Sequence, residues 1–468
     1  MKFQFIIKIL VRILSVSALA MSVCTGIAAY YGEAVLPFVF STAVSAVLAV
    51  FLYVFSPKQK VDFGKRNVFL AVALSWISIS LIGALPYIFS GVLPQFSDAL
   101  FESVSGFSTT GASVFIDVEL LPKSILFWRS LTNWIGGIGI ILLVIVIMPS
   151  LKMGSYQLFS MELQERIVPR IKDLGLRLMA IYVALTTLEI ALLRFGDMPL
   201  FDSICHALST ISSGGFSTRN TGISEYSPYI QYVIMLFMLL SGVNFIIFYF
   251  IVKGRFRKIK DNEELKYYLL IILITGISVA GILFFRQQQS AATSLRASFF
   301  QVISTITGTG FYTFDYMKWG KIGALFIILL SLCGGCMGST SGSIKIGRHI
   351  ILIKNIRCTI QSHIHPHSVY KITLNKKIIS PEDNNTIINF VSLYFLSILA
   401  GCVAMLLFGL DLQTSVTAVV SSIGCVGTGD FTTLPDSAKI LLSFLMILGR
   451  LELYAILILF FPSFWRKM

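Results

Sequence analysis

Four short glycine turns, each placed between two long apolar segments, constrain most strongly how this chain can fold. Irregular backbone is tolerated at bilayer depth only where protein buries it or where it lines a water-filled cavity. Glycine allows the backbone angles that aim successive carbonyl oxygens inward, and a ring of carbonyls can replace the hydration shell of a cation. The turns occupy residues 108–113, 212–217, 307–311 and 425–429, with Gly111, Gly215, Gly310 and Gly427 as their key glycines.

The spacing of these turns predicts an internal repeat. One such turn alone would be an ordinary loop, but four of them, about one hundred residues apart, predict a repeated unit of helix, short half-helix, turn and helix. We therefore expect two N-terminal helices in residues 1–66 and four repeats in residues 67–174, 175–266, 267–384 and 385–468.

The composition places the chain in the membrane. Its 468 residues are 56% hydrophobic and 13% charged, whereas a soluble domain has about 25% charged residues. The net charge of +14 falls mostly in short loops between apolar runs, so the orientation rule for membrane proteins explains it better than a nucleic-acid partner does. The chain is expected to lie in a lipid bilayer and to bind no nucleic acid.

Ten segments are apolar over about the 20 residues that a membrane span needs. The first resembles a signal peptide, but its apolar run is too long and another span follows it, which favours a transmembrane helix. The predicted spans are residues 9–31, 35–55, 67–90, 124–148, 175–195, 229–252, 267–285, 323–346, 387–408 and 440–461.

The distribution of charge predicts the orientation. Lys and Arg are concentrated in the loops between repeats, such as 253–266 and 345–377, and the side richer in them is cytoplasmic. Both termini are then cytoplasmic and the glycine turns lie toward the outside. Asp430 directly follows the fourth turn, where an acidic side chain would concentrate cations; an ordinary solvated loop charge is the alternative.

Two polar features interrupt later spans. Residues 334–343 (GGCMGSTSGS) hold several glycines, each of which costs a helix about 1 kcal/mol relative to alanine. This predicts a broken helix that gates a pore, with close helix packing through small residues as the alternative. Arg450 lies within the last span and would line a water-filled pore or pair with another helix. Glu452 is not its expected partner, because residues two apart do not share a helix face.

The remaining polar residues predict structural roles. The seven cysteines are odd in number and lie mostly in apolar segments, so no disulfide framework is expected. Cys333 and Cys336 are interpreted as packing residues, with a redox or metal role as the alternative. Asn133 and His206 are expected to be structural, and a metal site at His363, His365 and His367 lacks carboxylate or thiol ligands nearby. Nucleotide-binding and hydrolase motifs are absent from the sequence, so it does not predict an enzyme.

Together these segments resemble the Trk/Ktr/HKT superfamily of cation transporters, and most closely its bacterial TrkH/TrkG potassium-uptake branch. The resemblance covers essentially the whole chain. It rests on residues 106–113 (GFSTTGAS), 128–139, 334–345 and 449–452 (GRLE). It implies an all-α polytopic membrane protein with four membrane–pore–membrane repeats around one pore, preceded by two extra N-terminal helices.

The resemblance also implies roles for individual residues. In the family, glycine at the position of Gly111 accompanies potassium permeation. The fourth turn carries Thr428 where the family more often has proline, which implies less strict selection against rubidium or sodium. The implied potassium-binding residues of the selectivity filter are Thr109, Thr110, Gly111, Ser213, Gly214, Gly215, Thr309, Gly310, Cys425, Val426 and Gly427. The implied gate residues are Gly334, Gly335, Gly338, Ser339, Ser341, Gly342, Lys345 and Arg450.

The implied function is potassium uptake across the bacterial inner membrane through a channel-like pore. The family implies a homodimer and a cytosolic TrkA-type nucleotide-binding regulatory subunit, so that this chain binds K⁺ but no nucleotide. Two other functions are weighed against this one. A proton- or sodium-coupled potassium symporter would need ionisable residues at mid-membrane, and a membrane enzyme or scaffold would need catalytic groups clustered at one face.

Overall fold

The computed structural model describes residues 3–56, 65–142, 171–287, 290–314, 320–367 and 370–466. Nearly all of these residues with regular structure are helical. The exception is an antiparallel hairpin with two residues in each strand. The elements of the first half are α1 (Phe3–Tyr31), α2 (Leu36–Val54), α3 (Lys65–Gly83), α4 (Leu85–Phe89), α5 (Phe96–Phe107), α6 (Lys123–Leu142), α9 (Ile171–Phe195), α10 (Leu200–Ile211), α11 (Pro228–Ser241), α12 (Phe245–Val252) and α13 (Phe256–Lys260). Those of the second half are α14 (Glu263–Gln287), α15 (Ala291–Thr307), α16 (Gly320–Cys333), α17 (Ile346–Ile364), β1 (Thr373–Leu374), β2 (Lys377–Ile378), α18 (Pro381–Leu407), α19 (Leu412–Gly424), α20 (Asp436–Arg450), α21 (Tyr454–Leu457), η3 (Ile458–Phe460) and α22 (Pro462–Trp465).

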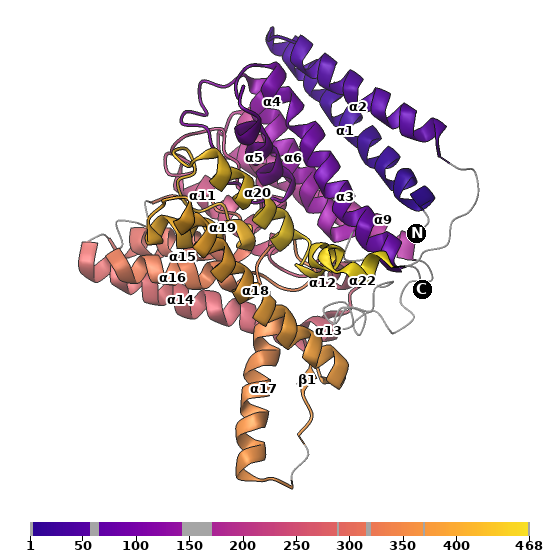
Figure 1. Cartoon of the computed structure of the whole chain (residues 1–468). Helices are drawn as coiled ribbons and strands as arrows, with labels where there is room; N and C mark the ends of the chain where they lie inside the picture. The colour runs from indigo at the N-terminus through magenta and orange to yellow at the C-terminus, as the bar shows by residue number, and fades with distance from the viewer. Residues whose placement is uncertain are drawn as a thin grey trace.

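The repeated unit expected from the sequence recurs four times. Each unit has a long first helix, a short helix at the place of the predicted pore segment, for which we keep the name pore helix, and a last helix. The four sets are α3, α5 and α6; α9, α10 and α11; α14, α15 and α16; α18, α19 and α20. Each pore helix also packs against the last helix of the preceding unit, as α10 does on α6, α15 on α11 and α19 on α16. The contact of α5 with α20 joins the first unit to the fourth. The units therefore form a closed ring, with the α1–α2 hairpin packed outside it against α3 and α6 (Figure 1).

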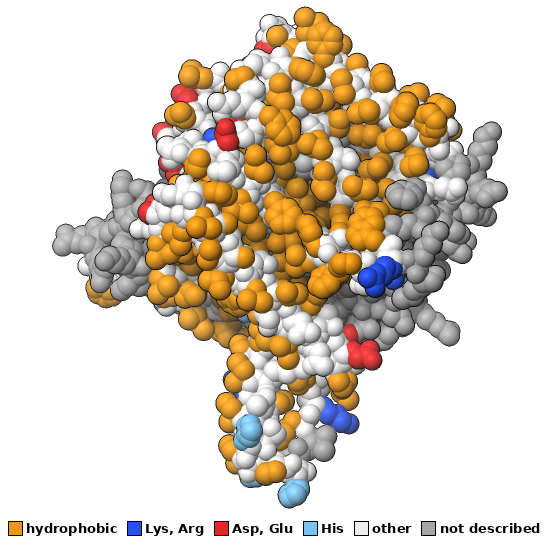
Figure 2. All heavy atoms as spheres, viewed as in Figure 1, with side chains coloured by type: hydrophobic (Ala, Val, Ile, Leu, Met, Phe, Trp, Pro, Cys, Tyr) orange, Lys and Arg blue, Asp and Glu red, His pale blue; other side chains and the backbone are white. Residues whose placement is uncertain are grey.

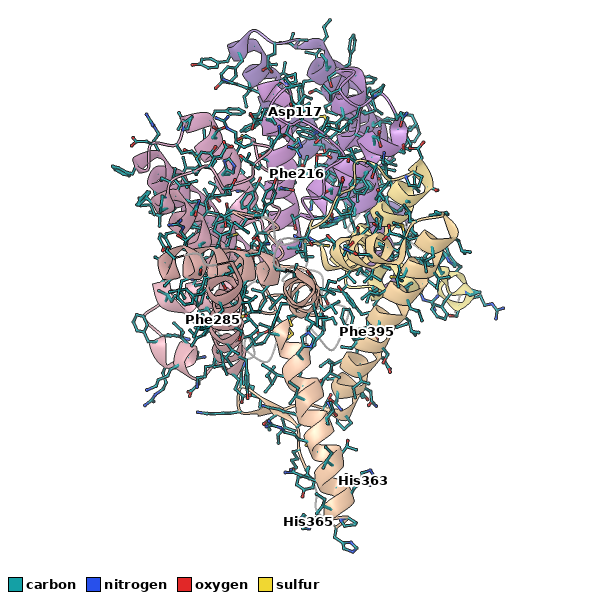
Figure 3. All side chains as sticks on the ribbon, turned by 90° about the vertical axis from the view of Figure 1, so that its left-hand side faces the viewer. Asp117, Phe216, Phe285, His363, His365 and Phe395 are labelled. Carbon is teal, nitrogen blue, oxygen red and sulfur yellow. The ribbon has the colours of Figure 1, made fainter. Side chains whose placement is uncertain are left out.

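The surface of the body is that of a membrane protein. Among the described residues, six helices are long and apolar enough to cross a membrane, and eight spans result if each of two bent pairs counts as one. Figure 2 shows hydrophobic side chains over most of the visible face of the body. Phe285 and Phe395, which are 82% and 50% exposed, lie on its flank in Figure 3. Exposed apolar surface this extensive suits hydrocarbon rather than water.

Two of the ten expected spans, besides the one predicted to break, are not continuous helices. Residues 229–252 form α11 and α12, which meet at 96°, and residues 440–461 form α20 followed by α21 and η3 at 109°. At the first bend, the Asn244 side chain accepts a hydrogen bond from the Ile246 amide and so starts a new helix. At the second, Glu452 and Leu453 adopt left-handed backbone angles, with φ of 56° and 57°. Apolar length, from which these spans were predicted, does not reveal the bends, because tertiary contacts hold both turns inside apolar runs.

Six of the other expected spans are present as apolar helices, those at 9–31, 35–55, 67–90, 175–195, 267–285 and 387–408. The span at 124–148 coincides with α6 as far as Leu142, and residues 143–148 lie outside the described part of the chain. The span at 323–346 breaks as predicted, because α16 ends at Cys333 and non-helical backbone leads to α17. α17 and the β1–β2 hairpin project from the body, with His363 and His365 at the tip (Figures 1 and 3).

Candidate functional site

The four glycine turns share one backbone conformation. The key glycines Gly111, Gly215, Gly310 and Gly427 all have left-handed φ angles, of 76°, 72°, 77° and 70°. The residue two positions earlier is also left-handed in every turn, with φ of 56° at Thr109, 57° at Ser213, 78° at Gly308 and 52° at Cys425. Left-handed angles at three non-glycine residues are uncommon and persist only when the surroundings enforce them. The equivalence of Gly308 was not predicted from the sequence, although glycine is the residue best suited to such a φ.

The same hydrogen bond anchors each turn to its pore helix. The amide before the key glycine donates to the carbonyl of a serine five residues earlier. The four bonds are Thr110 N to Ser105 O (2.9 Å), Gly214 N to Ser209 O (2.8 Å), Thr309 N to Ser304 O (2.9 Å) and Val426 N to Ser421 O (3.0 Å). These equivalent bonds reverse the chain at the same point of each unit, where the carboxyl end of the pore helix carries partial negative charge.

The turns abut one another in a closed ring. A methyl group at Gly111 would lie 2.1 Å from Gly214 O, one at Gly215 would lie 1.7 Å from Thr309 O, one at Gly310 would lie 2.2 Å from Val426 O, and one at Gly427 would lie 2.2 Å from Thr110 O. Each key glycine thus faces the carbonyl that precedes the key glycine of the next repeat. All eleven predicted filter residues belong to these four turns, which the fold brings together. Carbonyl oxygens around one axis can coordinate a dehydrated monovalent cation.

A hollow of about 610 Å³ opens on one side of the ring. The four key glycines line it together with the residues that follow each turn, including Arg219 and Asp430. Asp430 is exposed there and accepts hydrogen bonds from the Thr432 amide and hydroxyl. Its predicted effect on permeation stays a prediction, and its position beside the hollow is consistent with it.

Asp117 lies between two residues that line the hollow, Ile116 and Val118. Hydrogen bonding by the Asn220 side chain and the Glu119 amide holds the pKa of the exposed Asp117 carboxyl below its usual range. Figure 3 places Asp117 near one end of the body and Phe216, which follows Gly215, deeper inside. The Asp117 carboxyl therefore stays charged at neutral pH.

A buried ion pair stabilises the first turn. Arg129 Nε lies 2.7 Å from Glu102 Oε1, with both side chains almost fully buried. Glu102 also accepts bonds from the Ser113 hydroxyl and the Val114 amide, and the Arg129 guanidinium stacks 4.2 Å from the centre of the Phe216 ring. The sequence reasoning missed this pair, although a glutamate in a pore segment and an arginine in a span were visible signals.

Residues 334–345 lie on the other side of the ring from the hollow. The Thr340 hydroxyl contacts Ser213 Oγ at 2.8 Å and the Ile211 carbonyl at 3.2 Å, while a methyl group on Gly342 would lie 2.2 Å from Gly424 O. The loop therefore packs directly against the second and fourth turns. Thr340 was not among the predicted gate residues, yet it makes the central contact.

The predicted gate residues build this loop. The Ser341 hydroxyl accepts from Gly335 N at 3.0 Å and lies 2.6 Å from Ser339 Oγ. Gly338 O accepts from Phe245 N, which ties the loop to the start of α12. Gly334 and Gly338 have left-handed φ angles of 71° and 78°. Small side chains thus let the loop fold on itself with its polar groups satisfied inside the membrane.

Arg450 spans the space beside the loop. Its two terminal nitrogens donate to Thr340 O at 2.7 Å and to Gly136 O at 3.4 Å. The side chain is 2% exposed, and its hydrogen bonds join the first repeat to the loop of the third. Glu452 is not its partner, as predicted.

Lys345, by contrast, belongs to a buried ion cluster. Its Nζ lies 3.5 Å from Glu452 Oε1, and Arg348 lies 2.6 Å from Glu452 Oε2 while stacking 3.9 Å from the centre of the Phe390 ring. The structure gives Lys345 a partner more than a hundred residues away, which sequence spacing cannot reveal. The cluster anchors the end of the loop to the bend after α20.

The other candidates have structural environments. Asn133 packs against Gly214 and lies 3.5 Å from Ser209 Oγ. The buried His206 contacts Asp202 O and Ser217 Oγ. All seven cysteines are free. In the part of the chain that the structure describes, no three His, Cys, Asp or Glu side chains gather to hold a metal.

Comparison with known proteins agrees with this geometry. A family model described as TrkH, cation transport protein, matches residues 37–467. The chain belongs to the TrkH family of cation transport proteins. This family consists of transporters rather than enzymes.

Relatives resemble the chain over most of their length. The Trk system potassium uptake protein TrkH of Salmonella typhimurium is 35% identical over 429 residues, 88% of each chain. TrkG of Escherichia coli K12 is 35% identical over 428 residues, covering 88% of this chain and 87% of its own length. The crystal structure of the potassium transporter TrkH from Vibrio parahaemolyticus superposes with a TM-score of 0.93 at 29% identity and covers both chains fully.

Proposed function

We propose that this chain carries potassium into the cell through a single pore formed by its own four repeats. The observation that supports this most is the closed ring of four glycine turns, in which carbonyl groups of successive repeats abut. The names of the relatives agree, since each is a potassium uptake protein. The eleven filter residues would offer backbone carbonyls in place of water to a passing ion.

The experiment that tests this function is ion flux through the purified protein in liposomes, with potassium and sodium compared. Gly111→Ser is expected to reduce the potassium-to-sodium flux ratio at least about tenfold, since its Cβ would displace the Gly214 carbonyl, 2.1 Å away. Gly91→Ser is the matched control, because Gly91 has nearly the same φ, 74°, with open space around it. An unchanged ratio in Gly111→Ser would remove Gly111 from the filter.

The loop at residues 334–345 and Arg450 are proposed as the gate. They lie next to the ring on the side away from the hollow, and the positive charge of Arg450 opposes the passage of cations. Deleting residues 335–341 is expected to raise potassium flux in liposomes. Arg450→Gln should also raise it, whereas the exposed Arg194→Gln should not. A well-folded deletion variant whose flux is unchanged would contradict the gate.

Regulation and assembly are proposed by analogy with the family. The chain would act as a homodimer in the bacterial inner membrane with both termini cytoplasmic, and a TrkA-type nucleotide-binding subunit would dock from the cytosol. Since the nucleotide would bind that subunit, adding ATP to liposomes that contain only this chain should leave flux unchanged. Flux should respond to nucleotide once the soluble subunit is added.

A coupled symporter is the second candidate, and Glu189 is the observation that favours it. This carboxyl group is fully buried on α9, beside the Thr210 hydroxyl of the second pore helix, and ionisable groups within spans often mark proton relays. A channel predicts a reversal potential at the potassium equilibrium value. A symporter instead predicts a reversal potential that is displaced from this value and shifts with the proton or sodium gradient. If Glu189→Gln abolishes that displacement, the symporter is established.

A further inference from the structure

A second hollow, of about 550 Å³, lies where the corner between α12 and α13 meets the β1–β2 hairpin. One wall is apolar and is formed by Ile247, Phe250 and Phe256. Five cationic side chains line the rest: Arg255, Arg257, Lys258, Lys376 and Lys377. Lys258 lies 5.3 Å from the centre of the Phe250 ring, so its ammonium group faces the apolar wall.

Hydrogen bonds hold the two sides of this hollow together. Asn375 and Lys376 form the tight turn of the hairpin, with left-handed φ of 51° and 63°. The Asn375 side chain accepts from the Glu263 amide at 2.7 Å, and Lys376 Nζ lies 2.8 Å from Asp261. Asp261 is the acidic residue that lines the hollow. Specific hydrogen bonds and an ion pair therefore define the shape of the hollow, and its lining has a net positive charge.

The hollow lies at the edge of the apolar surface of the body. Val252 and Phe256 beside it are 74% and 64% exposed. α14 starts at Glu263, and its outward-facing apolar side chains begin at Tyr267, followed by Leu270 and Leu273. In Figure 1, α13 lies near the base of the projection that contains α17 and β1. The basic side chains thus meet the level at which hydrocarbon ends and lipid headgroups begin.

We propose that this hollow binds the phosphate group of an anionic membrane phospholipid, whose acyl chains lie along Val252 and Phe256. A cluster of Lys and Arg at the membrane surface attracts anionic headgroups, and arginine suits phosphate because of its paired donors. The apolar wall offers a hydrophobic contact surface that a free anion does not use. A soluble anion needs the charges alone, whereas a phospholipid contacts the charges and the wall together.

The test is retention of phosphatidylglycerol by the purified full-length protein, measured by native mass spectrometry against phosphatidylcholine. Arg255→Gln/Lys377→Gln removes two pocket charges and is expected to weaken phosphatidylglycerol binding about twenty-five-fold, at roughly five-fold per charge. Lys260→Gln/Lys371→Gln is the matched control, because it removes two exposed charges nearby that do not line the hollow. The control should bind like the unmodified chain.

A third variant separates the lipid from a free anion. The exposed Phe256→Ser is expected to weaken phosphatidylglycerol binding several-fold, and millimolar inorganic phosphate should not displace the lipid. Equal loss in the control variant would show general surface attraction and overturn the site. Displacement by phosphate, or unchanged lipid binding in Phe256→Ser, would overturn the lipid in favour of a free anion.

Discussion

The residues that follow the first two glycine turns make side-chain contacts with their pore helices that differ from those of the last two turns. Three residues before the anchoring serine, the four pore helices carry Glu102, His206, Gln301 and Ala418. Two residues after the key glycine, the turns continue with Ser113, Ser217, Tyr312 and Gly429. These two positions face each other in the first two repeats.

Only the first two pairs make this contact among the described residues. Ser113 Oγ donates to Glu102 Oε1 at 3.2 Å, and Ser217 Oγ lies 3.1 Å from His206 Nε2. The Gln301 amide is buried without a hydrogen-bond partner in the described residues, and Ala418 has no polar group to offer. The first two turns are thus held by side-chain clasps to their pore helices, Glu102–Ser113 and His206–Ser217. The third turn is held differently, by Ser304 Oγ, which donates to Phe311 O at 2.6 Å. In the fourth repeat, the Ser421 and Ser422 hydroxyls of the pore helix have no hydrogen-bond partner among the described residues.

Ion selectivity should be lost first in the repeat whose turn is held by the fewest side-chain contacts. A cation filter discriminates only while its carbonyl groups keep their spacing, so the fourth turn, which lacks such a side-chain bond among the described residues, is the expected place for distortion. Thr428, the position at which the resemblance to the family implies a proline, lies in this turn.

Breaking the clasp in the first repeat should have the largest effect. Glu102→Gln leaves the buried Arg129 charge without its counter-ion, which costs about 3–5 kcal/mol of unfolding free energy. We expect a markedly lower unfolding temperature in detergent and a reduced potassium-to-sodium flux ratio. The double variant Glu102→Gln/Arg129→Gln should recover part of the stability. A stable, selective Glu102→Gln would refute the comparison.

The clasp of the second repeat, Ser217–His206, should be weaker than that of the first because no ion pair supports it. Ser217→Ala removes the contact to His206 Nε2 while His206 Nδ1 keeps its contact with Asp202 O. The expected cost is about 1 kcal/mol, measured by thermal unfolding in detergent. The exposed Ser224→Ala serves as the control. A loss as large as that of Glu102→Gln would contradict the order of the two clasps.

The third repeat should tolerate loss of its polar group. Gln301→Met keeps a similar volume and removes a buried amide that lacks partners in the described structure, so stability should change by less than about 1 kcal/mol. The same unfolding assay decides this. A cost above about 2 kcal/mol would show that Gln301 is held as firmly as Glu102, and the contrast between the two halves would disappear.

The sequence revealed the turns and the broken loop because glycine marks both. Gly111 and its three counterparts stand out in apolar surroundings, and the run at 334–343 cannot continue a helix at low cost. The bends at residues 242–244 and 451–453 were not predicted, although Gly242, Asn244 and Glu452 lie at them, because a window of about 20 residues averages such residues into an apolar run. The Glu102–Arg129 pair and the Lys345–Glu452 pair depend on tertiary contact, which no local pattern reports.

The closure of the ring by α5 and α20 has a consequence for how this molecule can change over evolutionary time. In an assembly of four identical subunits, any substitution appears four times around the axis. Here one chain contains all four quarters of the ring, each with its own sequence. A substitution therefore changes one quarter, and the other three keep their geometry. One quarter can thus acquire a glutamate–arginine pair and another a non-helical loop, without either being imposed on its neighbours.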